Sequence, residues 1–192
     1  MNARTEGRLL LGFGLVVGLL LGFVLASSSY KSPPAQEGPV HYDYSRDGTN
    51  DAVLHYKQGL VDGAWEDRNL DGDPDIWHAY EEGVITRSQG DENFNGTIDA
   101  WYYYSNGLLA KMEMDRNEDD LIELMETYQF GQLIRQEWYT SATSLYRKVF
   151  FDRGVKTQEV IDTDSDGTID TKILFDDFEK PVQTTKIDVE DF

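Results

Sequence analysis

Residues 91–107 read Asp91-Glu-Asn-Phe-Asn-Gly-Thr-Ile-Asp-Ala-Trp-Tyr-Tyr-Tyr-Ser-Asn-Gly107, an acidic loop that leads into an aromatic run and ends at a glycine. The same order starts at Asp43, Asp67 and Asp115, so four units follow one another with a spacing of 24 residues (67 − 43, 91 − 67 and 115 − 91) and no gap. A fixed period of this kind is typical of repeat architectures, in which each unit is one supersecondary element.

Two further units continue the series with changes. A fifth unit near Tyr139 lacks the acidic residues, and a sixth, Asp162-Thr-Asp-Ser-Asp-Gly-Thr-Ile-Asp170, restores them. Asp162 lies 47 residues after Asp115 (162 − 115), one residue short of two periods. We therefore expect a single deletion in the fifth unit, with its strands kept and its metal-binding capacity lost.

Each acidic loop precedes a short segment rich in aromatic and β-branched residues. Partial alternation, as in Ile98, Ala100, Tyr102 and Tyr104, indicates a strand. The glycine that follows favours a tight turn, after which a second strand such as 108–112 returns to the next acidic loop. The recurring glycines are Gly59, Gly83, Gly107 and Gly131. One repeat therefore predicts one β-hairpin.

The predicted fold class is mainly β, an antiparallel β-hairpin repeat array with a period of 24 over residues 43–185, preceded by one N-terminal helix. Strands are expected to centre near Trp77, Trp101 and Met125. Hairpins in series place every glycine turn on one edge of a meander and every acidic loop on the other. Neighbouring loops should then lie roughly 9–10 Å apart, which is two strand spacings.

The recurring aromatic residues allow two interpretations. Tyrosine and tryptophan at hairpin spacing most often form cross-strand ladders in a core. The other interpretation is an exposed aromatic stripe for a protein or glycan partner on the sheet face, because a single-layer sheet leaves one face uncovered.

The acidic loops follow the pattern D-x-[DNS]-x-[DN]-G-x-x-D, with oxygen-bearing side chains at loop positions 1, 3, 5 and 9 and a glycine at position 6. Calcium takes about six to eight oxygen ligands, and a backbone carbonyl at position 7 and water can complete that set. The best candidate ligands for Ca²⁺ are Asp67, Asn69, Asp71, Asp75, Asp91, Asn93, Asn95, Asp99, Asp162, Asp164, Asp166 and Asp170. Weaker sets are Asp43, Ser45, Asp47 and Asp51, and Asp115, Asn117, Asp119 and Glu123.

An EF-hand begins in the same way but needs a bidentate glutamate at loop position 12 and an exit helix. Only Glu126 fits that position, and the glycine five residues later would interrupt a helix in the first four units. The loops instead resemble the calcium loops of integrin-type FG-GAP repeats and of thrombospondin type 3 repeats. The layout of one hairpin per repeat is similar to MORN-like repeats, although their glycine-rich signature is absent. The resemblance covers about nine residues per unit and implies calcium ligation at the positions given above.

Two alternatives to calcium stay open. Asp, Asn and Gly are good turn formers, so the loops could be turns without a metal. A minor alternative is a hydrolase that uses one loop metal. The histidines His41, His55 and His78 have no spacing that indicates a zinc site and are expected to be exposed.

Composition limits the classes of partner. The chain has 17 basic and 36 acidic residues, a net charge of −19 and a pI near 4.3, so it should repel nucleic acids. It has no cysteine, which excludes disulfides and thiolate sites. No motif of a nucleophilic or phosphate-binding enzyme is present, and we expect a protein that is not an enzyme.

The N-terminal segment, residues 1–29, contains an uncharged apolar run over residues 9–26 after Arg4 and Arg8. Its length favours an uncleaved membrane anchor over a cleaved signal peptide. The two arginines predict a cytoplasmic N-terminus, which places the rest of the chain outside the cytoplasm, either anchored or secreted. Residues 30–42 are expected to be a flexible linker and residues 186–192 an acidic tail.

These inferences combine into one functional hypothesis. The chain is expected to be a calcium-binding repeat protein of a cell envelope or surface that acts as a scaffold or interaction module. The competing hypothesis is a calcium-independent hairpin array that binds a partner and whose acidic loops are only turns.

Overall fold

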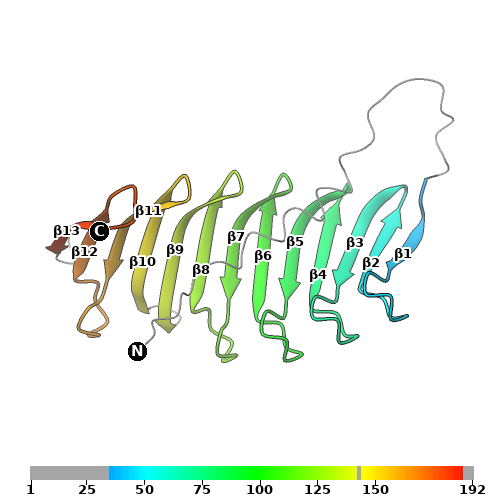
Figure 1. Ribbon diagram of the computed structural model, residues 1–192, viewed down its shortest axis with the longest axis horizontal. Helices are drawn as coiled ribbons and strands as arrows, with labels where there is room; N and C mark the ends of the chain where they lie inside the picture. Colours follow the sequence, from blue (N-terminus) through cyan, green and yellow to red (C-terminus); the bar gives the residue numbers. More distant parts are fainter. Residues whose placement is uncertain (1–34, 142–143, 188–192) are drawn as a thin grey trace, which may run out of the picture. The chain divides into compact units, whose positions relative to one another are not determined.

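The computed structural model describes residues 35–141 and 144–187, which form one antiparallel sheet of 13 strands in chain order (Figure 1). Among these residues none forms a helix long and apolar enough to span a bilayer. The expected N-terminal helix over residues 9–26 and the segment 1–29 that contains it lie outside the described residues. The predicted antiparallel hairpin sheet is confirmed.

The strands are β1 Gly38–Tyr42, β2 Ala52–Lys57, β3 Leu60–Glu66, β4 Ile76–Glu81, β5 Val84–Gly90, β6 Ala100–Ser105, β7 Leu108–Met114, β8 Leu124–Gln129, β9 Gln132–Ser141, β10 Ser144–Asp152, β11 Val155–Ile161, β12 Thr171–Phe175 and β13 Pro181–Lys186. Trp77, Trp101 and Met125 lie in β4, β6 and β8, as expected. The linker interpretation of residues 30–42 is wrong at its end, because residues 38–42 form the edge strand β1 and pair with β2. Strand β13 likewise extends to Lys186, the first residue of the expected tail.

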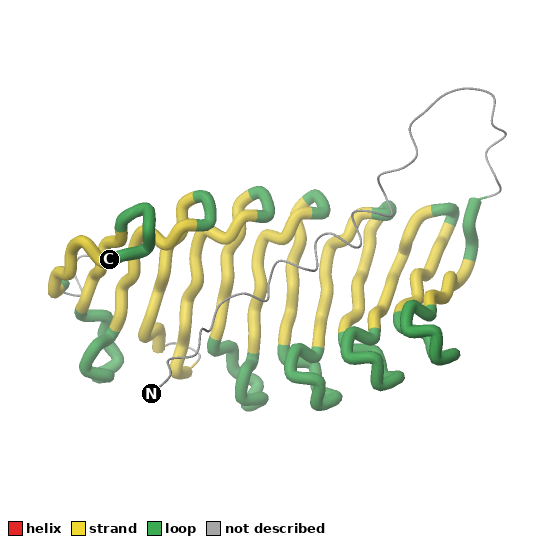
Figure 2. Tube along the Cα trace, viewed as in Figure 1, coloured by secondary structure: helices red, strands yellow, loops and turns green. Residues whose placement is uncertain are grey.

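Turns and acidic loops lie on opposite edges of the sheet (Figure 2). At a representative turn, Asn106 and Gly107 have φ angles of 51° and 76°, and a pair of positive φ angles is the signature of a type I′ turn. This turn matches the twist of the two strands that it joins. The glycine pattern therefore identified the turns correctly.

Every hairpin carries a β-bulge next to its turn. In the β6–β7 hairpin Tyr103 pairs with Lys111 and Tyr104 pairs with Leu109, which leaves Ala110 without a partner. The same shift recurs in the β2–β3, β4–β5, β8–β9 and β10–β11 hairpins. A bulge increases the local twist of a strand pair. One bulge at the same place in each repeat therefore gives each hairpin the same extra twist.

The two faces of the sheet differ in composition. We call one the tyrosine face; in the β2 to β9 region it carries Tyr56, Tyr80, Tyr102, Tyr104 and Tyr128. Most of the core lies here, formed by Ala52, Ala64, Ile76, Tyr80, Ala100, Met112 and Val149, all at most 9% exposed. The other, the tryptophan face, carries Trp65, Trp77 and Trp101 in register, and Trp77 keeps 36% of its surface exposed. Tyr80 thus belongs to the core and the other tyrosines of this face are half-buried around it, whereas the tryptophans line the other face.

The tyrosine face also buries polar groups, which pair with one another. Glu126 is 1% exposed and accepts hydrogen bonds from the Tyr128 hydroxyl and the Gln136 amide. Tyr102 donates a 2.6 Å hydrogen bond to Glu92, and burial raises the pKa of Tyr102. Because buried polar groups cost free energy unless they are hydrogen-bonded, these pairs allow an acidic chain to form a core.

The fifth unit keeps its strands, β9, β10 and β11, as expected. Its acidic loop is replaced by the short β9–β10 connection. Tyr139 and Tyr146 take the backbone hydrogen bonds that the first and last loop residues make elsewhere, and one residue fewer separates them than separates Asp115 from Glu123. This spacing agrees with a single deletion in the unit.

The expectation that all three histidines are exposed is wrong for His78, whose side chain is buried. His41 and His55 are exposed, as expected. The side chain of His78 is 7% exposed, its Nδ1 lies 2.7 Å from Ser88 Oγ, and its Nε2 lies 3.7 Å from Glu66 Oε1. Burial, with a smaller effect of the nearby Arg68 charge, lowers the pKa of His78 to about 4. Glu66 at 3.7 Å does not offset the cost of burying a charged imidazole.

We expect acid to destabilise the sheet through His78. Because the folded pKa of about 4 lies below the ordinary value of 6.5, the unfolded chain binds the extra proton, and stability falls as pH drops from 6.5 to 4. The loss is on the order of 3 kcal/mol. Thermal melts across this range should show a steeper fall for the wild-type protein than for His78→Gln. The His55→Gln control should retain the wild-type slope, and an equal slope in all three proteins would contradict this assignment.

Candidate metal-binding loops

Five acidic loops connect strands along one edge of the sheet (Figure 2). They are residues 43–51, 67–75, 91–99, 115–123 and 162–170. In each, the residue at loop position 4 adopts a positive φ, as Leu70 does at 63° and Phe94 at 61°. Position 6 also has a positive φ, and Asp120 adopts it at 66° where the other loops have glycine. The five loops therefore share one backbone conformation.

The carboxylate at position 1 holds this conformation. Asp67 is 4% exposed, and its two oxygens accept hydrogen bonds from the amides of Leu70 at 2.7 Å and Gly72 at 2.8 Å. Asp162 receives the equivalent bonds from Ser165 at 2.7 Å and Gly167 at 2.8 Å. Amides that point at one carboxylate satisfy groups that a tight loop would otherwise leave unpaired.

The residue at position 9 closes the loop from the other side. One oxygen of Asp51 accepts the amides of Tyr44 and Ser45, both at 2.6 Å, and Asp75 accepts those of Arg68 and Asn69. Asp51, Asp75 and Asp99 are at most 4% exposed. The acids at positions 1 and 9 thus have a structural role in addition to any role in metal binding.

Positions 3 and 5 face solvent. Asp71, at position 5, accepts the amide of Asp73 at 3.0 Å and the side-chain amide of Asn69 at 2.8 Å. These bonds lower the pKa of Asp71, and hydrogen bonds from Thr49 lower that of Asp47 in the same way. Both carboxylates therefore stay charged at neutral pH, and both are open to a cation.

In three loops the structure brings three carboxylates into one group, each offering an oxygen within 4.8 Å of the others. The groups are Asp43, Asp47 and Asp51; Asp115, Asp119 and Glu123; and Asp162, Asp164 and Asp166. Two of these groups fall in the loops with the weaker sequence pattern. The backbone at Asp120 and the serine at position 3 therefore do not prevent the acids from converging.

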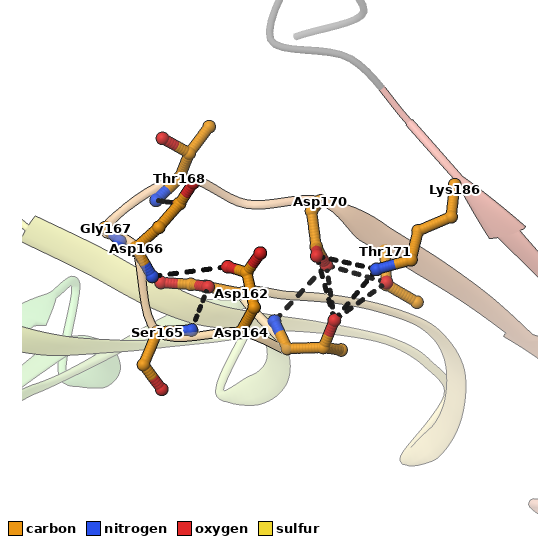
Figure 3. A network of polar contacts seen from close by, with 10 residues as sticks. Asp162, Asp164, Ser165, Asp166, Gly167, Thr168, Asp170, Thr171 and Lys186 are labelled. Carbon is orange, nitrogen blue, oxygen red and sulfur yellow. Dashed lines mark hydrogen bonds and ion pairs between the residues drawn. The ribbon is translucent and has the colours of Figure 1, made fainter.

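Asp170 lies apart from the other acids of its loop (Figure 3). Its carboxylate accepts a 2.6 Å bond from Lys186 of β13 and further bonds from the hydroxyls of Thr163 and Thr171. Lys186, followed by Thr171, holds the pKa of Asp170 well below its usual range. The predicted ligand Asp170 is thus engaged by a lysine that the loop pattern does not contain.

Side chains of the loops 67–75 and 91–99 bind acids of the next loop, which the expected arrangement does not include. The side-chain amides of Asn93 and Asn95 both donate to Glu118 of the next loop, the first at 2.9 Å. Arg68 likewise reaches the next loop and forms a 2.9 Å ion pair with Glu92. Neighbouring loops therefore contact one another through side chains, a link that the pattern of a single loop does not indicate.

The three carboxylate groups have a spacing that suits a metal ion of the size of calcium. Ligand oxygens at about 2.3–2.6 Å from Ca²⁺ stand at most about 5 Å apart across the ion, so oxygens within 4.8 Å of one another can share one coordination sphere. Each group consists only of carboxylates, without histidine, which is the hard-oxygen chemistry that calcium prefers. Several acidic groups in these loops could therefore hold a metal ion.

Comparison of this chain with protein-family models and with curated proteins finds no match. The likeness of the loops to FG-GAP and thrombospondin type 3 loops therefore stays a prediction from the motif. Conclusions about function depend on the loop geometry described above.

The structural role of position 1 can be separated from metal binding. In the presence of a chelator, Asp67→Ala should lower the free energy of unfolding by at least about 2 kcal/mol, because it removes an acceptor for two buried amides. For a chain of this size that corresponds to a fall in melting temperature of roughly 4–8 °C. Asp71→Ala, at an exposed position of the same loop, should cost less than half as much. Equal losses would show that position 1 has no special structural role.

Proposed function

We propose that the chain is a calcium-binding β-hairpin repeat protein that acts as a scaffold or interaction module and not as an enzyme. The observation that supports calcium is the convergence of three carboxylates in each of three loops. Like charges at such short range repel one another, and a bound divalent cation would remove that cost.

The candidate ligands differ between the three loops. In loops 43–51 and 115–123 the acids at positions 1, 5 and 9 would hold the ion. In loop 162–170 those at positions 1, 3 and 5 would do so, because Asp170 is paired with Lys186. A bound calcium ion would supply positive charge and cross-link the two sides of each loop.

Calcium would stabilise the sheet as a ligand of the folded state. A metal that binds only the folded array adds RT ln(1 + [Ca]/Kd) for each independent site, about 2.7 kcal/mol at a hundredfold excess over Kd. Three such sites would add about 8 kcal/mol, which is comparable with the whole stability of an ordinary domain, roughly 5–15 kcal/mol. Filled loops would thus rigidify one edge of the sheet and leave its faces for a partner.

The place of action follows from the N-terminal sequence. We propose that residues 9–26 anchor the chain in a membrane and that the repeat array lies outside the cytoplasm, where calcium is abundant. A protein or glycan on the sheet face is the proposed kind of partner. The charge of −19 supports a partner other than nucleic acid.

One observation favours the second candidate, a calcium-independent binding array. The acids at positions 1 and 9 accept backbone amides, as Asp75 does from Arg68 and Asn69, so part of their anionic charge is compensated without a metal. In that case the loops would be turns whose acids hold the backbone.

A melting experiment decides between the two candidates. The wild-type domain should melt at a higher temperature in millimolar calcium than in chelator. Asp119→Ala and Asp166→Ala should each reduce this difference, because each removes one carboxylate from a three-acid group. The matched control is Asp152→Ala, an exposed acid at the turn edge, which should leave the difference unchanged.

If the melting temperature of the wild-type domain is the same in chelator and in calcium, the calcium proposal is wrong and the calcium-independent array remains. Isothermal titration of calcium into the same domain gives the number of sites directly. We expect loss of one site in each of the Asp119 and Asp166 variants.

A further inference from the structure

The tryptophan face carries a cation and an acid at matching places in β7 and β9, and β5 carries the cation without the acid. In β7 and β9 a cation is followed two residues later by an acid on the same face, and the two form ion pairs: Lys111 with Glu113 at 2.5 Å and Arg135 with Glu137 at 3.0 Å. At the equivalent place in β5, Arg87 is followed by Gln89. Arg87 therefore lacks the acid that follows the cation in β7 and β9.

Arg87 is exposed, and it forms no ion pair within residues 35–141 and 144–187. Its guanidinium carbon lies 5.9 Å from the centre of the Tyr103 ring, a cation–π contact that leaves its hydrogen-bond donors available. An arginine with open donors beside aromatic rings is suited to bind a carboxylate in a bidentate manner.

Arg87 borders a shallow hollow of about 350 Å³ on this face. The register places Trp77, Gln89 and Trp101 in one cross-strand row and Ala79, Arg87 and Tyr103 in the next. Because side chains alternate along a strand, all six project on the same face. The small side chain of Ala79 leaves the space, and the two indoles stand roughly 9–10 Å apart on either side of Gln89.

The chemistry of these six side chains fits a sugar. Aromatic rings pack against the C–H faces of pyranose rings, and an amide and a guanidinium donate to hydroxyls and carboxylates. Strand β5 is paired on both sides, so its backbone cannot accept a peptide as an added strand. The ligand must therefore be recognised by side chains alone.

We propose that this hollow binds an acidic saccharide, with a uronate carboxylate on Arg87 and sugar rings against Trp77, Trp101 and Tyr103. The local charge permits an anion, because Arg87, Lys111 and Glu113 together carry one net positive charge. Arg87 precedes Asp91 of the nearest loop by four residues, roughly 13 Å of strand. That exceeds the Debye length of about 8 Å at physiological salt, so the loop charges are largely screened.

The inference deepens the proposed role as an interaction module and rests on it, but it does not need calcium. Titrations in chelator would therefore test the saccharide site even if the loops bind no metal. The melting experiment above would test calcium even if the hollow binds no sugar.

The test is isothermal titration of the full chain, in chelator, with an α-1,4-linked tetragalacturonate. Its fully methyl-esterified form is the matched neutral probe, and polyglutamate is the peptide probe. We expect the free acid to bind at least about tenfold more tightly than the ester, a preference that weakens with salt. Polyglutamate should not bind, because it lacks rings to pack on the indoles.

The decisive variant is Gln89→Glu. It restores the ion pair that the repeat uses in β7 and β9, so it should fold like the wild type and yet bind the free acid at least about tenfold more weakly. Arg87→Gln should remove the preference for acid over ester, and Trp101→Ala should weaken both. Arg135→Gln is the control, since Arg135 is already paired and lies outside the hollow.

Four results would overturn the proposal. Equal affinity for the free acid and the ester would mean that Arg87 does not recognise the carboxylate. Binding of polyglutamate as tightly as the sugar would mean that the ligand is an acidic peptide. If none of the probes binds, or if a folded Gln89→Glu variant keeps wild-type affinity for the free acid, the hollow is not a site for acidic saccharides.

Discussion

The structure depends on one set of backbone hydrogen bonds at the loop edge. The last residue of each of the first three acidic loops donates its amide to the residue before its own loop and accepts the amide of the first residue of the next unit. Asp75 donates to Glu66 and accepts from Asp91, both at 2.8 Å, and Asp99 does the same between Gly90 and Asp115. These bonds tie each loop to the units on either side of it and recur with the 24-residue period. Where one residue is missing, at Tyr139 and Tyr146, the same bonds persist and the loop is shortened instead.

These bonds also bring acids together in the least exposed part of the edge. Three of them join the acid at position 9 of one loop to the acid at position 1 of the next: Asp51 with Asp67, Asp75 with Asp91, and Asp99 with Asp115, all at most 4% exposed. Burial, with Asp91 and Glu92 nearby, raises the pKa of Asp99, whereas loop amides lower that of Asp162 against its own burial. The backbone thus compensates the acids unequally. The side chains at positions 3 and 5 are the exposed ones, and an ion from solvent can reach them without displacing the fold.

Sequence reasoning worked for features that one unit specifies by itself. The glycines, the alternation in 98–104 and the fixed spacing predict the hairpins, their turns and the row of loops, because each is local and repeated. It did not work for features that need a partner from another unit. The donation of Asn93 to Glu118, the pairing of Asp170 with Lys186 and the pairing of residues 38–42 with β2 all join segments whose contact depends on rotamers or register. His78 shows a related limit, since alternation says which residues share a face but not which face is buried.

A repeat offers an internal comparison that a single domain lacks, because equivalent positions share backbone geometry and differ only in side chains. Lys111 and Arg135 show what a cation at that position does when an acid follows it, and Arg87 shows the same position without the acid. Removing one partner of an ion pair normally leaves a charge that solvent must compensate. Here the unpaired charge lies beside two indoles and a neutral amide, at a shallow hollow on the tryptophan face. Because the backbone is the same in all three repeats, any difference in saccharide binding between them would come from Gln89 and the rings around it, so side-chain substitutions alone can test the hypothesis.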